Sequence, residues 1–205
     1  MNTARYIFAL ILVLAHPPGI LLWVAIHPFA RFWRRLGPVW TYAILGVPIL
    51  AYMVGAYLAR DAILAVDFGM SYPLTALAVL ALVAGSRMAI RRRKHLSFGI
   101  LTGLPELSTH RHPGRLLTDG PYARIRHPRY VEVVLWTVAY ALFANHLGSY
   151  LVVVGSLPVL YLVVVLEERE LRERFGDEYI EYCRRVPRFV PRRDTPNRSF
   201  PLPNR

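Results

Sequence analysis

The chain has 205 residues, of which 55% are apolar and 19% are charged, and its formal net charge is +12. This composition suits one domain of ordinary size and excludes an acidic disordered chain, a collagen-like fibre and a disulfide scaffold. The single cysteine, Cys183, also excludes an internal disulfide and a cysteine-rich zinc site. Because the basic residues lie between long uncharged apolar stretches, the sequence favours a membrane protein over a nucleic-acid-binding one.

Long apolar segments predict an all-α integral membrane protein with about five transmembrane helices. Residues 6–26, 40–59 and 68–86 carry no formal charge, and each is long enough to cross a hydrocarbon core of about 30 Å as a helix. Residues 133–166 are also uncharged, but their 34 residues are short for two crossings of about 20 residues each. Turn-forming residues at 145–149 divide this segment, so we expect a helical hairpin of two short membrane helices.

The basic residues are distributed unevenly between the two faces that five helices create. Arg5 and Arg60 fall on one face, and the other 23 basic residues fall on the opposite face. The more basic face of a membrane protein is usually cytoplasmic. We therefore expect the N-terminus outside and the C-terminal segment in the cytoplasm.

The same pattern divides the chain into three parts. Residues 1–90 are predicted to form a three-helix transmembrane scaffold. Residues 91–193 are predicted to form a functional region that contains a connector, the helical hairpin and a C-terminal segment. Its polar and aromatic parts, 91–130 and 167–193, form a cytoplasmic layer in this interpretation. Residues 194–205 are predicted to be a disordered tail, because they are short of apolar residues and rich in proline.

One segment with a chemical signal is GPYARIRHPRY, at residues 120–130. Its Gly-Pro-Tyr start is typical of a tight turn, and Pro128 suits the first turn of a membrane helix, where its missing N–H would have no partner. Residues just before such a helix can offer backbone N–H groups to a ligand. The alternative is an interfacial belt, in which Arg and Tyr anchor the helix at the level of the lipid headgroups.

Acidic residues follow directly after the last apolar segment, at a membrane edge that is otherwise basic. Glu168 with Arg172, and Glu170 with Arg174, are spaced four residues apart, which is typical of ion pairs on a solvated helix face. Glu167 is explained less well, because the C-terminus of a helix disfavours an anion. We expect this carboxylate to lie opposite a cation.

Glu132 lies near the bilayer at the start of the hairpin and is a candidate functional residue, because acids in that position are costly. The alternative is an ion pair with Arg126 or Arg129. No metal site is expected, since His110 and His112 lack a carboxylate or thiol at helix spacing to complete one.

Two long motifs stand out: LLTDGPYARIRHPRY at residues 116–130 and EExxLxxxFGxxYxxYxxxVP at residues 167–187. They resemble the motifs of the isoprenylcysteine carboxyl methyltransferases and their bacterial and archaeal relatives. They occur in the family's order with a membrane hairpin between them. The resemblance covers residues 96–193.

This resemblance implies a membrane methyltransferase that uses S-adenosyl-L-methionine in the cytoplasmic layer and acts on an amphiphilic or small acceptor. Glu167 would take the polar end of the cofactor, with Glu168 supporting it. His127 and Glu132 are candidate catalytic bases for an amine or hydroxyl acceptor, whereas a carboxylate or thiolate needs no base. The implied cofactor-binding residues are Arg115, Leu116, Leu117, Tyr122, His127, Pro128, Arg129, Tyr130, Glu167 and Glu168.

Two departures from the family bear on the acceptor. The eukaryotic prenylcysteine enzymes carry an Arg four residues before the first Glu of the pair, where this chain has Val163, and many relatives have a small residue in place of Glu132. Both argue against a prenylcysteine carboxylate. One alternative is a phospholipid amine or a thiol methylated at the same cofactor site. Another is a non-catalytic membrane protein that binds anionic lipid through its basic face.

The expected location is a prokaryotic inner membrane, with the protein crossing it several times. The expected partners are the lipid bilayer and the methyl acceptor, and nucleic acid is not expected among them.

Overall fold

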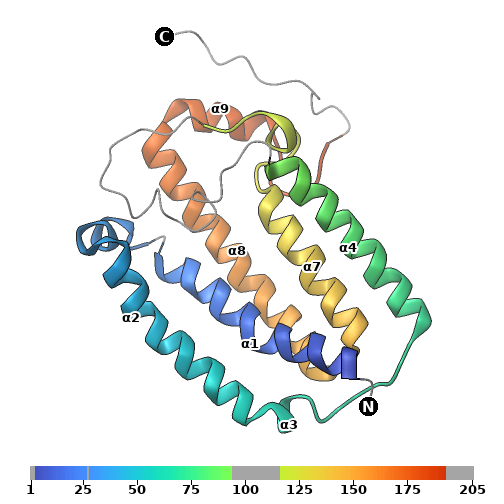
Figure 1. Ribbon diagram of the computed structural model, residues 1–205. Coiled ribbons are helices and arrows are strands. Elements are labelled where there is room, and N and C mark those ends of the chain that lie inside the picture. Colours follow the sequence, from blue (N-terminus) through green and yellow to red (C-terminus); the bar gives the residue numbers. More distant parts are fainter. Residues whose placement is uncertain (1–2, 27, 94–115, 193–205) are drawn as a thin grey trace.

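The computed structural model describes residues 3–26, 28–93 and 116–192 (Figure 1). In these ranges every regular element is a helix, which confirms the predicted all-α fold. In chain order the elements are α1 (Thr3–Ile26), α2 (Ala30–Leu58), α3 (Arg60–Ile63), α4 (Tyr72–Arg93), the 3-10 helix η1 (Gly120–Ala123), α7 (Pro128–Ala144), α8 (Leu147–Phe175) and α9 (Asp177–Arg185).

Four of the described helices are long and apolar enough to cross a membrane: α1, α2 from Arg35 onwards, α4 and α8. The predicted hairpin is also present, because α7, with 17 residues, passes directly into α8. The turn between them contains Asn145 in the left-handed conformation (φ 53°), which suits Asn better than most residues. The chain is therefore a multi-pass membrane protein.

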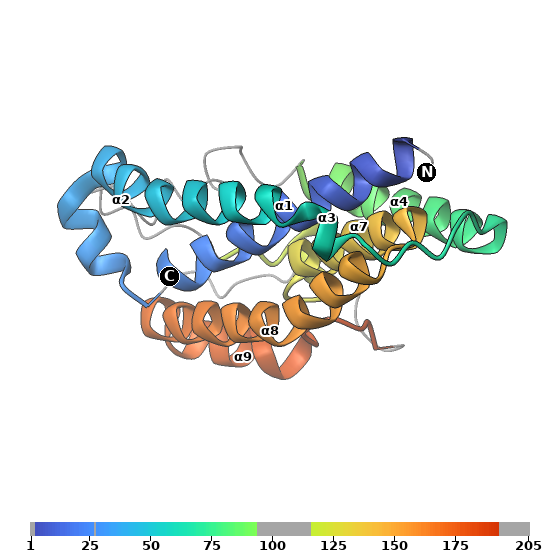
Figure 2. The same cartoon turned by 90° about the horizontal axis from the view of Figure 1, so that it is seen from below.

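The long helices form a bundle in which α2 lies at one edge, beside α1, and α4 lies at the other, beside α7 (Figure 1). In Figure 2, α8 and α9 lie on one side of α1 and α2 lies on the other. The start of α1 and helix α9 lie at opposite ends of the bundle. The end where α9 lies, called the α9 end below, brings together the end of α4, η1, the start of α7 and the last turns of α8.

Small residues allow the closest helix packing. In α4 the buried positions include Ala78, Gly85 and Ala89, which repeat along one face of the helix. A Cβ atom at Gly85 would lie 2.7 Å from the Cδ1 atom of Trp136 on α7. Gly148 on α8 is even more restricted, since a Cβ atom there would overlap the backbone oxygen of Ile63.

A buried polar cluster closes the end of the bundle that holds the N-terminus. Arg5 is 3% exposed, forms an ion pair with Asp67 and donates a hydrogen bond to the backbone oxygen of Ala144 at 2.9 Å. The backbone N–H of Phe68 donates to the oxygen of Asn145 at 3.1 Å, so the loop before α4 is also joined to the hairpin turn. The hydrogen bond from Arg5 holds the pKa of Asp67 below its usual range.

Replacing Gly148 by Ala is expected to lower the free energy of unfolding by about 1–3 kcal/mol, because the added methyl group overlaps backbone that cannot move freely. Gly155 on the same helix has open space where its Cβ atom would lie, with no heavy atom within 4 Å, so Gly155→Ala is the matched control. Thermal unfolding in detergent micelles measures both variants. Equal midpoints for the two variants would contradict the packing described here.

Replacing Asp67 by Asn is expected to remove an acid-sensitive part of the stability. A carboxyl whose pKa is lowered in the folded state stabilises the fold above its unfolded-state pKa of about 3.9, and this stabilisation is lost as the pH falls through the folded-state pKa. The melting temperature of the wild type should therefore drop below about pH 4 more steeply than that of Asp67→Asn. Asp61→Asn, at an exposed position, should behave like the wild type.

Candidate functional site

Glu168 on α8 is the central charge of the α9 end, and its side chain is 1% exposed. Its Oε1 atom accepts a hydrogen bond from Nη2 of Arg126 at 2.9 Å and lies 3.1 Å from Nε2 of His127. Its Oε2 atom accepts from Nη2 of Arg188 at 2.7 Å and from Nη2 of Arg172 at 3.3 Å. Buried carboxylates are tolerated when they are paired and hydrogen-bonded in this way.

The segment after α9 is fastened to the start of α7. The backbone N–H of Arg126 donates to the oxygen of Pro187 at 2.8 Å, and that of His127 donates to the oxygen of Arg188 at 3.1 Å. The Arg126 side chain adds a bond from Nη1 to the oxygen of Val186 at 3.0 Å. Arg126 and Arg188 therefore both bind the carboxylate of Glu168, and the backbone segments that carry them are joined to each other.

Helix α9 packs across η1 through its apolar face. Tyr179 and Tyr182 are buried and form a cluster with Leu116 and Val186, while the Tyr182 hydroxyl donates to the backbone oxygen of Tyr122 at 2.7 Å. Burial raises the pKa of Tyr182, so this hydroxyl stays protonated as a donor. The sharp turn that brings α9 back is made at Gly176, whose φ of +54° favours glycine.

The interpretation of Glu168 as part of a solvated face was wrong. The predicted pair with Arg172 is present at 3.3 Å, but Glu168 itself is buried and has three further cationic or imidazole partners. Glu167 was expected beside a helix C-terminus, whereas α8 continues to Phe175. A signal for the burial of Glu168 was available, because it follows the buried Val164 by one helical repeat of four residues.

Glu167 faces a different set of neighbours. Its side chain is 31% exposed, and its Oε2 atom lies 3.8 Å from Nδ1 of His127. Tyr130 interacts with the same carboxylate. Oε2 is buried, and no hydrogen-bond donor to it is found among the residues that the structure describes. His127 therefore lies between the carboxylates of Glu167 and Glu168.

Glu132 forms a buried ion pair with Arg92, at the end of α4. Nε of Arg92 donates to Oε2 at 2.9 Å and Nη2 donates to Oε1 at 3.1 Å, and both side chains are 4% exposed. The partners considered from the sequence were Arg126 and Arg129. Arg126 binds Glu168 instead, and the guanidinium of Arg129 lies over the ring of Trp23 at 4.3 Å from the centroid.

Arg92 was missed because it stands among three consecutive arginines. The signal that singles it out is the buried face of α4, on which it follows Gly85 by seven residues and Ala89 by three. Arg91 and Arg93 are exposed, as residues on the other sides of the helix should be.

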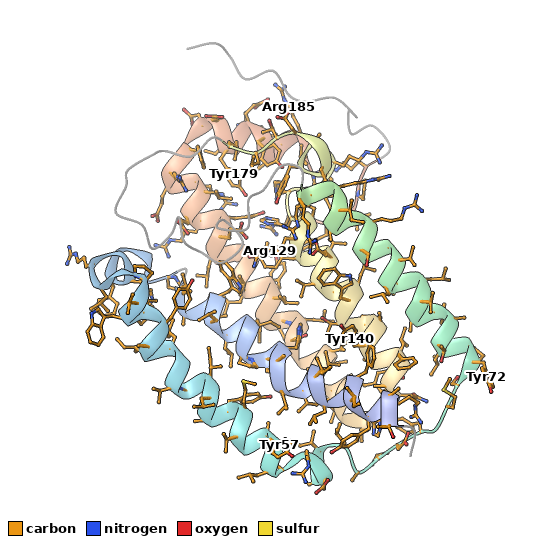
Figure 3. The ribbon with its side chains drawn as sticks, in the orientation of Figure 1. Tyr57, Tyr72, Arg129, Tyr140, Tyr179 and Arg185 are labelled. Carbon is orange, nitrogen blue, oxygen red and sulfur yellow. The ribbon has the colours of Figure 1, made fainter. Side chains whose placement is uncertain are left out.

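Tyr122 lies near the charged groups of both Glu167 and the Arg92–Glu132 pair. Burial raises the pKa of its hydroxyl, and the charges of Arg92, Glu167, Arg129 and Glu132 are close enough to shift that pKa in opposite directions. Figure 3 shows Arg129 near the end of α7 that faces α9, and Tyr140 towards the other end of that helix.

Most of the predicted site residues therefore lie together at the α9 end. Leu116 is turned away into the cluster beneath α9, and Leu117 is partly exposed. Arg115 lies outside the described residues. The predicted residues that the structure brings together are Tyr122, His127, Pro128, Arg129, Tyr130, Glu132, Glu167 and Glu168.

Glu168→Gln is expected to lower the free energy of unfolding by about 3 kcal/mol, because it leaves the largely buried guanidinium of Arg126 without its counter-charge. The matched control is Glu173→Gln on the same helix, where both partners of the Glu173–Arg169 pair are exposed and the loss should stay under about 1 kcal/mol. Thermal unfolding and limited proteolysis of the segment after α9 measure the two effects. A Glu168→Gln variant as stable as the control would contradict a central role for this carboxylate.

A family model described as phospholipid methyltransferase matches residues 74–178, more than half of the chain. The chain is 32% identical over 78 residues to "Protein-S-isoprenylcysteine O-methyltransferase B" of Arabidopsis thaliana, a match that covers 38% of this chain and 40% of that protein. It is 35% identical over 82 residues to "Methanethiol S-methyltransferase 1" of Bradyrhizobium diazoefficiens, covering 38% and 27%.

A third relative is the "Cobalt-zinc-cadmium resistance protein CzcN" of Cupriavidus metallidurans, 36% identical over 78 residues, with 38% of this chain and 36% of that protein covered. The chain thus spans two fifths or less of the length of these relatives. No solved structure matches it significantly.

Proposed function

This chain belongs to the phospholipid methyltransferase family, and we propose that it is an integral membrane methyltransferase that uses S-adenosyl-L-methionine. The observation that carries the proposal is the carboxylate of Glu167. One of its oxygens is buried without a hydrogen-bond donor among the described residues, at a site lined by Tyr122 and Tyr130. The cofactor has a sulfonium and an ammonium group, and such a carboxylate suits either of them.

The residues around Glu167 fit the rest of this cofactor. Tyr122 and Tyr130 supply aromatic faces on which a cation or a nucleobase can lie. Pro128 and Arg129 form the adjoining turn of α7, and Leu117 precedes η1. In this proposal Glu168 does not touch the cofactor. It holds His127 and the start of α7 in place, and His127 in turn sets the position of Glu167.

When bound, the cofactor supplies a methyl group activated by its positively charged sulfur. The protein then has to align the acceptor with that methyl group and keep water out. Alignment alone contributes up to about 7–11 kcal/mol in the best intramolecular models. The fastened segment after α9 and the buried pairs of the α9 end provide the rigid walls that such alignment requires.

The geometry bears on the acceptor. Both oxygens of Glu132 are bound by Arg92, and His127 lies within 4 Å of two carboxylates, so each candidate base is already engaged. We infer that His127 and Glu132 act by positioning and that the nucleophile is a carboxylate or a readily ionised thiol. Such acceptors need no general base, whereas a phospholipid amine would need one. The relatives named above as acting on an S-isoprenylcysteine oxygen and on methanethiol agree with this chemistry.

The proposed acceptor is amphiphilic and approaches from the bilayer. Tyr130 belongs to a buried apolar cluster with Ile20 on α1 and Leu160 and Val164 on α8, so the site adjoins the apolar interior between the membrane helices. A tail buried there would gain about 0.8 kcal/mol for each methylene group removed from water. In this arrangement the α9 end is cytoplasmic, where a soluble cofactor has access, and the N-terminus lies outside.

Glu167→Gln is expected to weaken the binding of S-adenosyl-L-methionine by about tenfold or more, since a hydrogen bond to a charged group is worth about 1.5–3 kcal/mol. Binding of its neutral-sulfur product, S-adenosylhomocysteine, should weaken less if the carboxylate faces the sulfonium. Isothermal titration calorimetry on protein in micelles measures both ligands. The exposed Glu173→Gln is the control, and unchanged affinity of a folded Glu167→Gln variant for both ligands would refute the proposal.

A further inference from the structure

The guanidinium of Arg92 has one hydrogen-bonding atom that its ion pair does not use. Nε and Nη2 bind the two oxygens of Glu132, at 2.9 and 3.1 Å. Nη1 is buried and has no hydrogen-bond acceptor among the residues described in the structure. A buried donor of this kind is rare in native proteins and calls for an explanation.

The ion pair fixes where this donor lies. A guanidinium bound through two of its nitrogens to one carboxylate cannot rotate, because the fork of donors is planar and rigid. Both side chains are 4% exposed, and the packing of α4 against α7 holds them on either side. Glu132 therefore acts as a positioning residue that sets the direction of Nη1.

The surroundings of Arg92 belong to the same site as Glu167. Both charges act on the hydroxyl of Tyr122, one lowering and the other raising its pKa. Helix α4 also packs directly on η1, which carries Tyr122. The site thus contains a buried carboxylate oxygen of Glu167, on α8, without a donor and a buried guanidinium N–H of Arg92, on α4, without an acceptor among the described residues.

We propose that Arg92 is an anion-binding residue of this site, whose Nη1 donates to a carboxylate or phosphate oxygen of a bound ligand. Together with Glu167, which accepts from a cationic group, it makes the site selective for ligands that carry both charges or for a cation and an anion bound side by side. The inference rests on the proposed function. Its oxyanion has two possible sources, the carboxylate of the cofactor and an anionic headgroup on the acceptor.

The test uses a variant that removes the pair without leaving one charge buried alone. Arg92→Gln combined with Glu132→Gln keeps hydrogen-bonding capacity in both side chains. Arg93→Gln, at the exposed neighbouring position, is the matched control. If the double variant does not fold, as judged by thermal unfolding, Arg92→Lys replaces it, because Lys keeps the charge opposite Glu132 but loses the fixed second donor.

The first arm of the test measures the affinity of S-adenosyl-L-methionine and of its decarboxylated form by calorimetry. If Arg92 binds the cofactor's carboxylate, the wild type and Arg93→Gln should prefer the carboxylated form by about tenfold, as expected for one bond to a charged group. The double variant should bind the two forms alike. Glu167→Gln should weaken both forms and leave the preference intact.

The second arm compares the binding affinity of dodecanoate with that of dodecanol in the presence of S-adenosylhomocysteine, measured by tryptophan fluorescence. If Arg92 binds the headgroup of the acceptor, the wild type should prefer the anionic compound and the double variant should not. The inference is overturned if the double variant keeps the preference for the anionic ligand in both arms. It is also overturned if the wild type shows no such preference in either arm. In both cases the proposed function stands. A wild type that binds neither S-adenosyl-L-methionine nor its product overturns the proposed function, and the inference with it.

Discussion

The burial of a single carboxylate, that of Glu168, sets the geometry of the α9 end. A carboxylate that is 1% exposed can stay ionised only if charged donors surround it. The donors come from the turn before α7 and from the segment after α9, so the requirement to neutralise Glu168 brings together distant parts of the chain, such as those that carry Arg126 and Arg188. The packing of α9 against η1 follows, because the segment that carries Arg188 comes directly after α9 and so holds this helix in place.

Two adjacent glutamates serve different purposes because successive residues on a helix point in directions about 100° apart. Glu168 points into the bundle and is satisfied by the protein itself. Glu167 points towards Tyr130 and keeps one oxygen without a donor among the described residues. An arrangement of this kind separates the charge that holds the fold from the charge that is free to meet a ligand. His127 couples the two, because its ring lies between them.

The sequence predicted best those features that depend on the composition of a whole segment, such as the long apolar helices. Uncharged stretches predicted the long helices, yet α4 continues to Arg93 and α8 to Phe175, because a helix need not end where its charges begin. The same effect removes the helix-end argument that singled out Glu167, since this residue is followed by two further helical turns and no helix C-terminus lies beside it. Only the periodicity of buried positions, not the composition, could identify which charges face inwards.

The division into an N-terminal scaffold and a separate functional region stays a prediction, but the contacts connect the two parts closely. Trp23 on α1 packs against the guanidinium of Arg129 at the start of α7. Helix α4 runs across the predicted boundary at residue 90, and its last turn pairs Arg92 with Glu132. The family match also begins at residue 74, within α4, rather than at the connector. A site assembled from four membrane helices and the segment after α9 would change its shape if any one of these helices shifted.

The two positions at which the sequence departs from the prenylcysteine enzymes, Val163 and Glu132, are explained together by these contacts. Val163 is fully buried in the apolar cluster around Tyr130, so an arginine at this position would be buried and would need an anionic partner. Glu132, the second departure, is what allows Arg92 to be buried near Tyr122. In the proposal made above, the cation that meets the oxyanion comes from α4 instead of α8, on the opposite side of α7. We therefore expect the oxyanion it recognises to lie against α4, with the apolar cluster of α1 and α8 left to a hydrocarbon tail.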